Sequence, residues 1–512
     1  MNLSNSTTDN TERLKDTRKL AHQWETIDWV LAENYVNRLQ TRIAKATVAG
    51  NKNRAKRLQY LVTHSFYAKA YAVKKVTSNK GKNTSGVDRK LWSSPAAKMK
   101  AVLALTDKQY RSKPLRRVFI EKKGKNKKRP LGIPTMYDRA MQTLYALALE
   151  PIAEISSDSI SFGFRRGRSA QDACEQIFCV LARKCSPTWV LEGDIKGCFD
   201  NINHDWLQEN IPMDKRIMKQ FLQSGFVYKG NLFPTNNGSP QGGAISSLYA
   251  NMTLDGMEKL IQDKYHRNSK GKIENHYRAK TKVNIVRYAD DFVITADTRE
   301  IAEEVKNLVS QFLETRGLTL SEEKTMITHI DNGFDFLGWT FRKFKGKLII
   351  KPSKSSIKSL VRKCATIILK EGKAISQSDL IRRLNQVLRG WSNYHRHVVA
   401  SQAFSYINNT IYLLLQRWAK HRHPNKNQWW RLNKYWHEKN GKPWLFMTDE
   451  SSLINLRRID IIRHPKLQIS KNPFIHKAYF TKRKLQLQSL FAARNGEEML
   501  EPYERETLTY GS

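Results

Sequence analysis

The chain has 512 residues, enough for three or four domains, and its 40% share of hydrophobic residues is sufficient for real cores. Lys and Arg total 89 against 47 Asp and Glu, so the net charge of +42 favours nucleic acid as a partner, with an anionic membrane surface as the weaker alternative. No apolar run reaches 18 residues and the five cysteines form no CxxC pair, which argues against a membrane span, a zinc knuckle and a disulfide framework and favours reduced thiols.

The N-terminal part is expected to be mostly helical. Residues 1–24 mix acids and bases without an apolar core, which excludes a secretory signal and predicts a polar lead-in. Residues 25–75 carry apolar side chains near helical spacing, with Lys and Arg on the other faces. A loop rich in Gly, Ser and Asn follows at 78–88.

A basic β-hairpin is predicted over residues 116–135, with its turn at Gly124–Asn126. Its Lys and Arg side chains either cover a solvated face or contact a ligand that bears phosphate. We favour phosphate contact, because the stiff segment Pro130–Pro134 follows Arg129 and would hold it in place. A second basic loop, at 161–178, contains glycine and leads into a helix.

Two strand ends carry carboxylates. A strand signal at Trp189–Leu191 ends at Asp194, and apolar runs on both sides of Asp290 and Asp291 predict a β-hairpin with both carboxylates at its tip. Taken singly, a helix cap would explain the first and a solvated acidic turn the pair. Adjacent like charges repel and oxygen ligands suit Mg²⁺, so we expect the strand to lie beside the hairpin. The three carboxylates would then share two Mg²⁺ ions, with the carbonyl of Ile195 as a further ligand.

The segments around this acidic hairpin predict a ferredoxin-like core. Residues 233–262 form a Gly-rich loop and a helix; the loop would let backbone approach a base pair or phosphate, although an ordinary turn explains it as well. Residues 294–320 predict a strand, a helix, a stop at Gly317 and another strand. With the strand at 189–194 the order is β-α-β-β-α-β.

From about residue 351 the chain changes to basic helices. Residues 351–430 contain 15 Lys and Arg against 2 Asp and Glu. Three apolar stripes predict a bundle whose basic outer faces suit a duplex backbone. Beyond 430, Trp and Tyr alternate with Lys and Arg and would either stack on bases or form the core of a small domain, which is the favoured interpretation for any single Trp.

These blocks resemble, in order, the reverse transcriptases encoded by mobile group II introns, the maturase class. KNTSGVD resembles the extra N-terminal block of that family. The polymerase blocks correspond to RPLGIPT with MYDRAMQTLYALALEPIAE, SFGFRRGRSAQDA, DIKGCFDNI, GSPQGGAISSLYANM, RYADDF, GLTLSEEKT and GFDFLGW, and the maturase-specific thumb to LNQVLRGWSNYHRH and QRWAKHRHPNK. The YADD tetrapeptide alone is weak, but the ordered set is highly specific and covers about residues 25–485.

The resemblance implies an α+β right-hand polymerase with fingers, a ferredoxin-like palm, an α-helical thumb and a basic C-terminal DNA-binding appendage. The expected divisions are a polar lead-in (1–24), a helical extension of the fingers (25–100), fingers and palm (101–345), the thumb or domain X (346–430), and a DNA-binding region with an acidic tail (431–512).

The resemblance also implies catalytic roles. Asp194, Asp290 and Asp291 would hold the metal ions, and Lys324 would protonate the leaving pyrophosphate unless it is an ordinary surface lysine. Phe199 would lie under the sugar of the incoming nucleotide and exclude a 2′-hydroxyl, unless it is a core aromatic. The other nucleotide-binding residues implied are Pro240, Gln241, Lys127, Lys128 and Arg129.

Nucleic-acid contacts are expected from the basic loop at 161–178, the primer grip and the thumb. The residues implied are Arg165, Arg166, Arg168, Gly338, Trp339, Arg389, Arg396, Arg417 and Arg422.

The implied activity is RNA-directed DNA polymerase, in a protein that also binds its intron RNA to promote splicing and supports retrohoming by target-primed reverse transcription. Its partners would be the intron RNA, a DNA target and primer, dNTPs and two Mg²⁺ ions, without a membrane; a homodimer is left open. A bacterial cytoplasm, at the nucleoid, is the expected location, with an organelle left open.

The C-terminal tail departs from the pattern of the family, and three rival functions remain open. Many relatives end in a zinc-supported endonuclease with CxxC pairs and histidines, whereas this tail is short and acidic with neither, so we expect that domain to be absent. The rivals are a splicing factor with an idle polymerase, a domesticated reverse transcriptase such as one used in phage defence, and an RNA-dependent RNA polymerase, which Phe199 disfavours.

Overall fold

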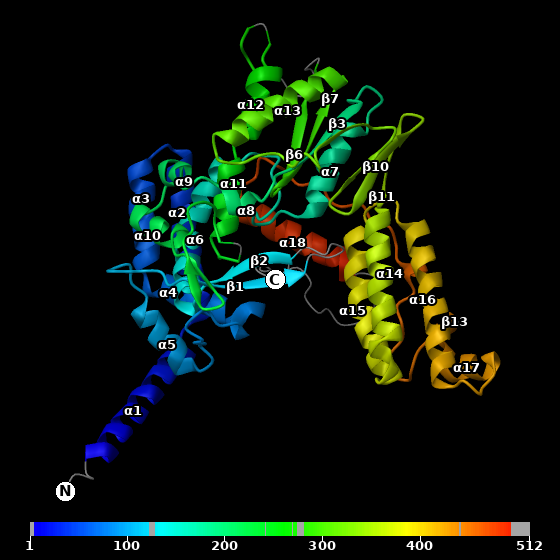
Figure 1. The fold of residues 1–512 in the computed structure, drawn as a ribbon, viewed down its shortest axis with the longest axis horizontal. Helices are drawn as coiled ribbons and strands as arrows, with labels where there is room; N and C mark the ends of the chain where they lie inside the picture. Colours follow the sequence, from blue (N-terminus) through cyan, green and yellow to red (C-terminus); the bar gives the residue numbers. More distant parts are fainter. Residues whose placement is uncertain are drawn as a thin grey trace.

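The structure, a computed structural model, describes six stretches of the chain. They are residues 5–121, 128–240, 242–268, 270–273, 281–439 and 442–492, with side chains described except at 5–14, 439, 442–443 and 491–492. Helices of the first hundred residues lie on one side, a central sheet lies at the top, and a helical bundle lies on the opposite side (Figure 1).

The N-terminal helices are α1 (Asn5–Glu25), α2 (Trp29–Val48), α3 (Lys52–His64), α4 (Phe66–Ser78) and α5 (Pro95–Ala104), with a 3₁₀ turn at Lys80–Asn83. The helices predicted for 25–75 are confirmed, and α2, α3 and α4 pack against α6 (Met136–Ser156).

The N-terminal lead-in differs from the expectation, because α1 is a helix that projects from the body of the molecule (Figure 1). Its last turns are anchored by apolar packing. Trp24 is buried and Leu20 packs on the same core, which gives this end of a polar helix a tertiary partner.

A four-stranded sheet contains the predicted basic hairpin. Its strands are β1 (Leu115–Glu121), β2 (Lys128–Ile133), β4 (Phe226–Tyr228) and β5 (Asn231–Phe233), in the order β2-β1-β4-β5. β1 and β2 pair antiparallel from Arg116 opposite Ile133 to Glu121 opposite Lys128, which confirms the hairpin. The turn predicted at Gly124–Asn126 lies outside the described residues.

The central sheet has the predicted ferredoxin-like topology. Its strands are β3 (Trp189–Asp194), β6 (Asn284–Tyr288), β7 (Asp291–Ala296) and β8 (Met326–His329), in the order β6-β7-β3-β8 with every pair antiparallel. The helix between β7 and β8, α13 (Arg299–Glu314), begins after Thr298, whose side chain accepts from the Ile301 amide, and is followed by Gly317 at φ +73°.

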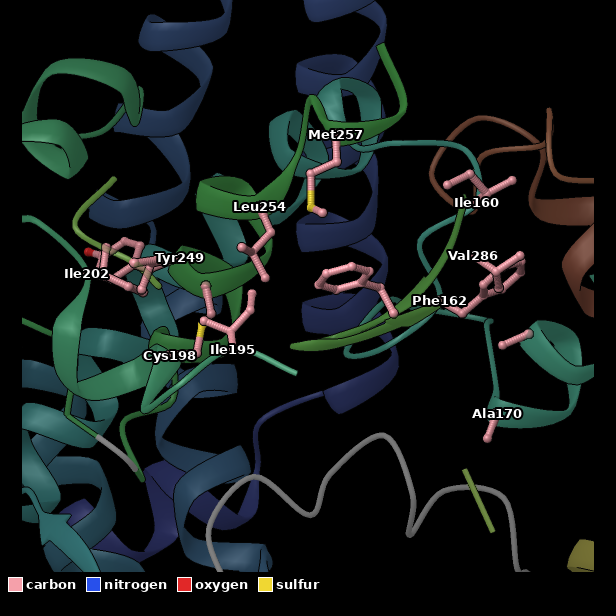
Figure 2. Close-up of a cluster of buried hydrophobic side chains, with 14 of the residues drawn as sticks. Ile160, Phe162, Ala170, Ile195, Cys198, Ile202, Tyr249, Leu254, Met257 and Val286 are labelled. Atoms are coloured by element: carbon pink, nitrogen blue, oxygen red, sulfur yellow. The ribbon is translucent and has the colours of Figure 1, made fainter. Parts of the chain in front are cut away.

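Of the helices before and after β3, α7 (Ala170–Leu181) and α12 (Met257–Tyr265) pack against β6 of this sheet. The others are α8 (Cys198–Asn201), α9 (His204–Asn210), α10 (Lys215–Leu222) and α11 (Ser246–Leu254). Figure 2 shows Ile195 and Cys198, just after β3, beside Leu254 of α11. This apolar contact fixes the direction in which the chain leaves Asp194.

A second core lies in the helical bundle formed by α14 (Lys354–Leu369), α15 (Gln377–His395) and α16 (Ser401–Arg422). The three predicted apolar stripes face one another there, as expected. Between the central sheet and the bundle lies a three-stranded sheet of β9 (Phe334–Phe336), β10 (Trp339–Phe344) and β11 (Lys347–Pro352). Beyond α16 come α17 (Gln428–Tyr435), β12 (Trp436–Lys439) and β13 (Lys442–Phe446).

The last described stretch, residues 459–492, returns from the bundle to the N-terminal helices and is called here the C-terminal segment. It follows a 3₁₀ turn at Leu456–Arg458 and ends in α18 (Lys477–Ala492), which crosses the molecule between the bundle and the N-terminal layer (Figure 1). It was expected to be part of a DNA-binding appendage, but much of it is packed into the body.

Hydrogen bonds attach the C-terminal segment at both ends of its path. Arg396 of the bundle donates to the carbonyl of Asp460 at 3.2 Å, and Thr41 of α2 donates to the carbonyl of Phe474 at 3.0 Å. Leu467 and Phe474 are buried. Apolar burial of this kind explains why the segment docks in spite of its basic composition.

Membrane insertion has no candidate in the fold. Among the residues that the structure describes, none of the helices combines the length and the hydropathy needed to cross a lipid bilayer.

Candidate active site

Three carboxylates converge at one edge of the central sheet. Asp194 ends β3 and lies directly opposite Asp291, the first residue of β7. Asp290 occupies the turn between β6 and β7, next to Ala289, which has a positive φ of 57°. The structure therefore brings the strand beside the hairpin, as the sequence predicted.

The acidic edge is electrostatically unfavourable on its own. Burial, followed by the charges of Asp290 and Asp194, raises the pKa of Asp291 to about 7. Burial also raises the pKa of Asp290, the charge of Asp194 adds to this rise, and Arg129 and Lys324 oppose it. A cation bound at these two carboxyl groups would therefore favour their ionised forms.

The ammonium of Lys324 supplies one positive charge. Its Nζ lies 2.6 Å from Oδ2 of Asp194, and the lysine side chain is about half exposed. The loop that carries it is tied to the same strand, because the amide of Ser321 donates to the carbonyl of Asp194 at 2.8 Å. Lys324 is thus a direct neighbour of one of the three carboxylates.

The donor set suits Mg²⁺ in the way that phosphoryl-transfer enzymes use it. Within the described ranges, no group of three or more His, Cys, Asp or Glu side chains is arranged so that it could hold a metal ion by itself. Mg²⁺ is usually held by one or two carboxylates together with substrate phosphates and water, so a preformed cage is not required. Such a site needs oxygen donors whose ionised form is stabilised by a cation.

The loop before α11 packs against the segment that carries Phe199. The amide of Ser239 donates to the carbonyl of Phe199 at 2.7 Å, and a methyl group on Gly238 would meet the carbonyl of Asp200 at 2.5 Å. Gly238 has a φ of 83°, so both its conformation and its close approach require glycine. Pro240 follows directly, and Gln241 lies outside the described residues.

Phe199 itself is half-buried, and its ring centroid lies 6.4 Å from that of Phe164. It is therefore neither a free surface ring nor a fully enclosed core residue. Part of its surface therefore remains exposed.

The basic hairpin contributes positive charge on the opposite side. Lys128 and Arg129 are exposed at the start of β2, and Arg129 is close enough to lower the pKa of Asp290 relative to the effect of burial. Lys127 lies outside the described residues. The sequence predicted phosphate contact for this hairpin, and that stays a prediction; the charge of Arg129 acts on the acidic edge.

Two arginines of the 161–178 loop do not contact nucleic acid, which corrects the expectation for them. Arg165 and Arg168 are buried, and both pair with Glu154 of α6, at 2.7 and 3.1 Å. Arg165 donates to the second oxygen of Glu154 as well, at 2.8 Å. The guanidinium of Arg166 lies 5.5 Å from the ring centroid of Phe474, under the C-terminal segment.

The residues expected to form the primer grip and the thumb surface divide into two groups. The side chains of Trp339 and Arg396 are buried, so direct contact of either side chain with nucleic acid is excluded in this conformation. Gly338 lies in a left-handed turn with a φ of 82°. Arg417 and Arg422 are exposed on α16, and Arg389 is half-buried on α15.

Sequence reasoning missed two groups that the fold makes important. Tyr394 lies in the motif LNQVLRGWSNYHRH with no role of its own expected, yet its hydroxyl donates to the carbonyl of Leu337 beside Gly338. Asp172, His464 and Arg483 form a buried ion cluster that ties α7 to the C-terminal segment. Neither has a local signal, because each partner is far away in the chain.

Comparisons with known proteins agree with this geometry. Three family models match: the N-terminal domain of reverse transcriptase over residues 24–105, reverse transcriptase (RNA-dependent DNA polymerase) over 120–341, and the group II intron maturase-specific domain over 357–436.

Relatives in bacteria and fungi are similar over long stretches. The group II intron-encoded protein LtrA of Lactococcus lactis subsp. cremoris is 30% identical over 440 residues, 70% of this chain and 72% of LtrA. Protein YkfC of Escherichia coli (strain K12) is 30% identical over 338 residues, 59% of this chain and 87% of YkfC. A 91 kDa protein in the cob intron of Schizosaccharomyces pombe is 25% identical over 411 residues, 66% of this chain and 50% of that protein.

Among solved structures, telomerase from Candida albicans aligns with a TM-score of 0.35 and 14% identity, covering 65% of each chain. A likeness this distant supports no conclusion. The identity to LtrA, over more than two thirds of both chains, is sufficient. The protein belongs to the reverse transcriptases with a maturase domain that group II introns encode, and it is an RNA-directed DNA polymerase of the right-hand, α+β type.

Proposed function

We propose that the acidic edge is where this reverse transcriptase adds dNTPs to a primer on an intron RNA template. The observation that carries the proposal is the register of β3 against β7, which sets Asp194 opposite Asp291 and next to Asp290. In the reaction the primer 3′-oxygen bonds to the α-phosphorus. The bond from that phosphorus to the oxygen bridging the β-phosphate breaks, and pyrophosphate leaves.

The residues that would hold two Mg²⁺ ions are Asp194, Asp290 and Asp291, with the carbonyl of Ile195. When bound, such ions lower the pKa of an attacking hydroxyl and neutralise charge on the leaving phosphate. Lys324, paired with Asp194 at 2.6 Å, is the chain's own proton source for the pyrophosphate.

The nucleotide would be held between the basic hairpin and Phe199. Arg129, with Lys127 and Lys128, offers charge and hydrogen bonds to the triphosphate. The ring of Phe199 would take the space that a 2′-hydroxyl needs, and Pro240 and Gln241 are the residues expected beside the new base pair. The packing of Ser239 against the Phe199 carbonyl keeps these two parts in register.

As a maturase, the protein would bind intron RNA through exposed cations of the thumb, such as Arg417 and Arg422. Such recognition depends mainly on shape and phosphate contacts. The RNA would supply the splicing chemistry and the protein would stabilise its fold. After splicing, the complex would reverse-splice into a DNA target, and the polymerase would copy the intron from a DNA primer. A net charge of +42 makes the nucleoid the expected location.

The test is primer extension on poly(rA)/oligo(dT) with the double variant Asp290→Asn, Asp291→Asn. We expect the rate of dTTP incorporation to fall at least about a hundredfold, because charge stabilisation in the transition state is lost. Splicing of the intron RNA by the same variant should stay within about twofold of wild type, because the thumb surface is unchanged.

The matched control is Asp331→Asn, which removes an exposed carboxylate outside the acidic edge. It should leave both activities unchanged. If the wild-type protein extends the primer no faster than the double variant, the splicing-only alternative is correct. If the RNA that co-purifies contains no group II intron, the domesticated alternative is favoured instead.

A further inference from the structure

The turn between β9 and β10 has a backbone conformation that its own sequence does not favour. Leu337 has a φ of 49° and Gly338 a φ of 82°. A left-handed conformation suits glycine but is uncommon and unfavourable for leucine, at a cost of about 1 kcal/mol or more. Surrounding structure must therefore hold the turn in place.

The end of α15 and the start of α14 provide this support. The hydroxyl of Tyr394 donates to the carbonyl of Leu337 at 2.9 Å, and the amide of Ser353 donates to the carbonyl of Gly338 at 2.9 Å. Both carbonyls of the turn are thus bound by groups from the bundle side.

An aromatic stack makes the same connection. Trp339, fully buried directly after the turn, lies against Tyr394 with ring centroids 4.6 Å apart and planes within 3° of parallel. One tyrosine therefore contacts both sides of Gly338: its hydroxyl binds the residue before the glycine, and its ring binds the residue after it.

The neighbouring hydrogen bonds leave Tyr394 little freedom. Ser356 of α14 accepts from the indole of Trp391 at 3.0 Å and pairs with Nε2 of His395 at 3.0 Å. Burial lowers the pKa of His395 to about 3, so its ring is neutral near pH 7. This network joins α14 to the last turn of α15 on both sides of Tyr394.

The turn is also close to the strand that carries a catalytic carboxylate. The carboxyl of Asp335 in β9 acts electrostatically on Glu192, which lies two residues before Asp194 on the same face of β3. The same Asp335 accepts a hydrogen bond from Thr340 of β10. Strand β9, which leads into the turn, thus lies beside the strand that ends at Asp194.

We infer that Tyr394 is a positioning residue for the primer terminus: it holds the Leu337–Gly338 turn, and through it the primer 3′-hydroxyl, at a set distance from the acidic edge. The inference rests on the proposed function. It also takes up the expectation that Gly338 contacts the primer strand. Because the support comes from α15, a rotation of the bundle would displace the turn as well.

The experiment is single-turnover addition of one nucleotide to a primer–template duplex by the full-length protein, with Tyr394→Phe and Tyr394→Leu. Tyr394→Phe keeps the stack and loses the hydroxyl, so the maximal rate should fall about three- to tenfold. Tyr394→Leu loses both contacts and should cost more than tenfold. The Kd for the duplex should stay within twofold, because the surface of the thumb is unchanged.

The matched control is Tyr137→Phe in α6. Its hydroxyl also donates to a backbone carbonyl, that of Ala104, at 2.9 Å, and it accepts from the amide of Thr106 at 3.2 Å, so the control loses at least as much hydrogen bonding as Tyr394→Phe. The control should keep both the rate and the Kd within twofold of wild type, while its unfolding temperature should fall at least as far as that of Tyr394→Phe.

The inference is overturned if Tyr394→Phe behaves like Tyr137→Phe, or if it weakens duplex binding and leaves the maximal rate unchanged. A wild-type protein that adds no nucleotide would contradict the proposed function itself, which is a different result. Should Tyr394→Leu fail to fold, Tyr394→Phe with its control still decides.

Discussion

At the scale of single residues, the acidic edge shows how packing changes the chemistry of a side chain. Asp290 and Asp291 are ordinary carboxylates in the sequence, yet burial raises the pKa of both, and the charge of Asp194 adds to each rise. Lys324 sits at one side and Arg129 acts from the other. The site therefore combines buried carboxyl groups with two nearby cations, Lys324 and Arg129.

Phe199 gives the residue-scale prediction. Truncation to alanine removes the ring that would occupy the space of a 2′-hydroxyl, so the preference for dTTP over UTP should fall about tenfold or more. The measurement is the ratio of kcat/KM for the two nucleotides on the same primer–template. The dTTP value should change by less than threefold, and an unchanged ratio would show that Phe199 is not the gate.

At the scale of elements, several sequence expectations were confirmed because the signals are local. The hairpin of β6 and β7, the stop of α13 near Gly317 and the stripes of the bundle follow from periodicity and turn chemistry. The basic loop at 161–178 was misjudged in part. Arg165 and Arg168 look like phosphate ligands in the sequence, but Glu154, eleven and fourteen residues earlier, is their partner.

The buried pairing of Arg165 and Arg168 with Glu154 gives the element-scale prediction. Glu154→Ala leaves two guanidinium groups without their counter-charge, so the free energy of unfolding should fall by about 3–5 kcal/mol. Denaturant unfolding followed by the fluorescence of the tryptophans measures the change. The control is Glu303→Ala, whose partner Arg299 is exposed on α13; that loss should be below about 1 kcal/mol. Equal losses would contradict a structural role for Glu154.

At the scale of the whole molecule, the C-terminal segment links parts that the chain order separates. It bonds to Arg396 in the bundle, to Asp172 in α7 and to Thr41 in α2. Phe480 in α18 packs so closely on Gly167 that a methyl group there would come within 2.6 Å of its ring. A segment expected to bind DNA therefore also holds thumb, palm and fingers together.

The molecule-scale prediction concerns Asp172, which is buried with His464 at 2.9 Å and with Arg483. Burial alone would raise the pKa of Asp172, but the hydrogen bond and charge of His464, with Arg483, hold that pKa below its ordinary value. The ionised carboxyl thus stabilises docking above its unfolded pKa of about 3.9, and this stability is lost as the pH falls through the lower folded pKa.

For Asp172→Asn we expect a protease to cleave the segment 459–492 on the order of 100-fold faster than in wild type at pH 7.5. The ratio should be the same at pH 5.5 and shrink only below about pH 4. Cleavage sites identified by mass spectrometry measure it. A ratio that already disappears by pH 6 would assign the stabilisation to a group other than this carboxylate.

The sequence by itself determined the class of the protein, its order of elements and the strand ends that carry the three carboxylates, because strands, turns and the apolar faces of helices depend on residues close together in the chain. Only the tertiary structure decided which charged side chains remain available. Arg165, Arg168 and Arg396 are taken up by partners inside the fold, and Tyr394 comes to a turn 57 residues away. Such pairings arise from the packing of whole elements, and no local pattern carries them.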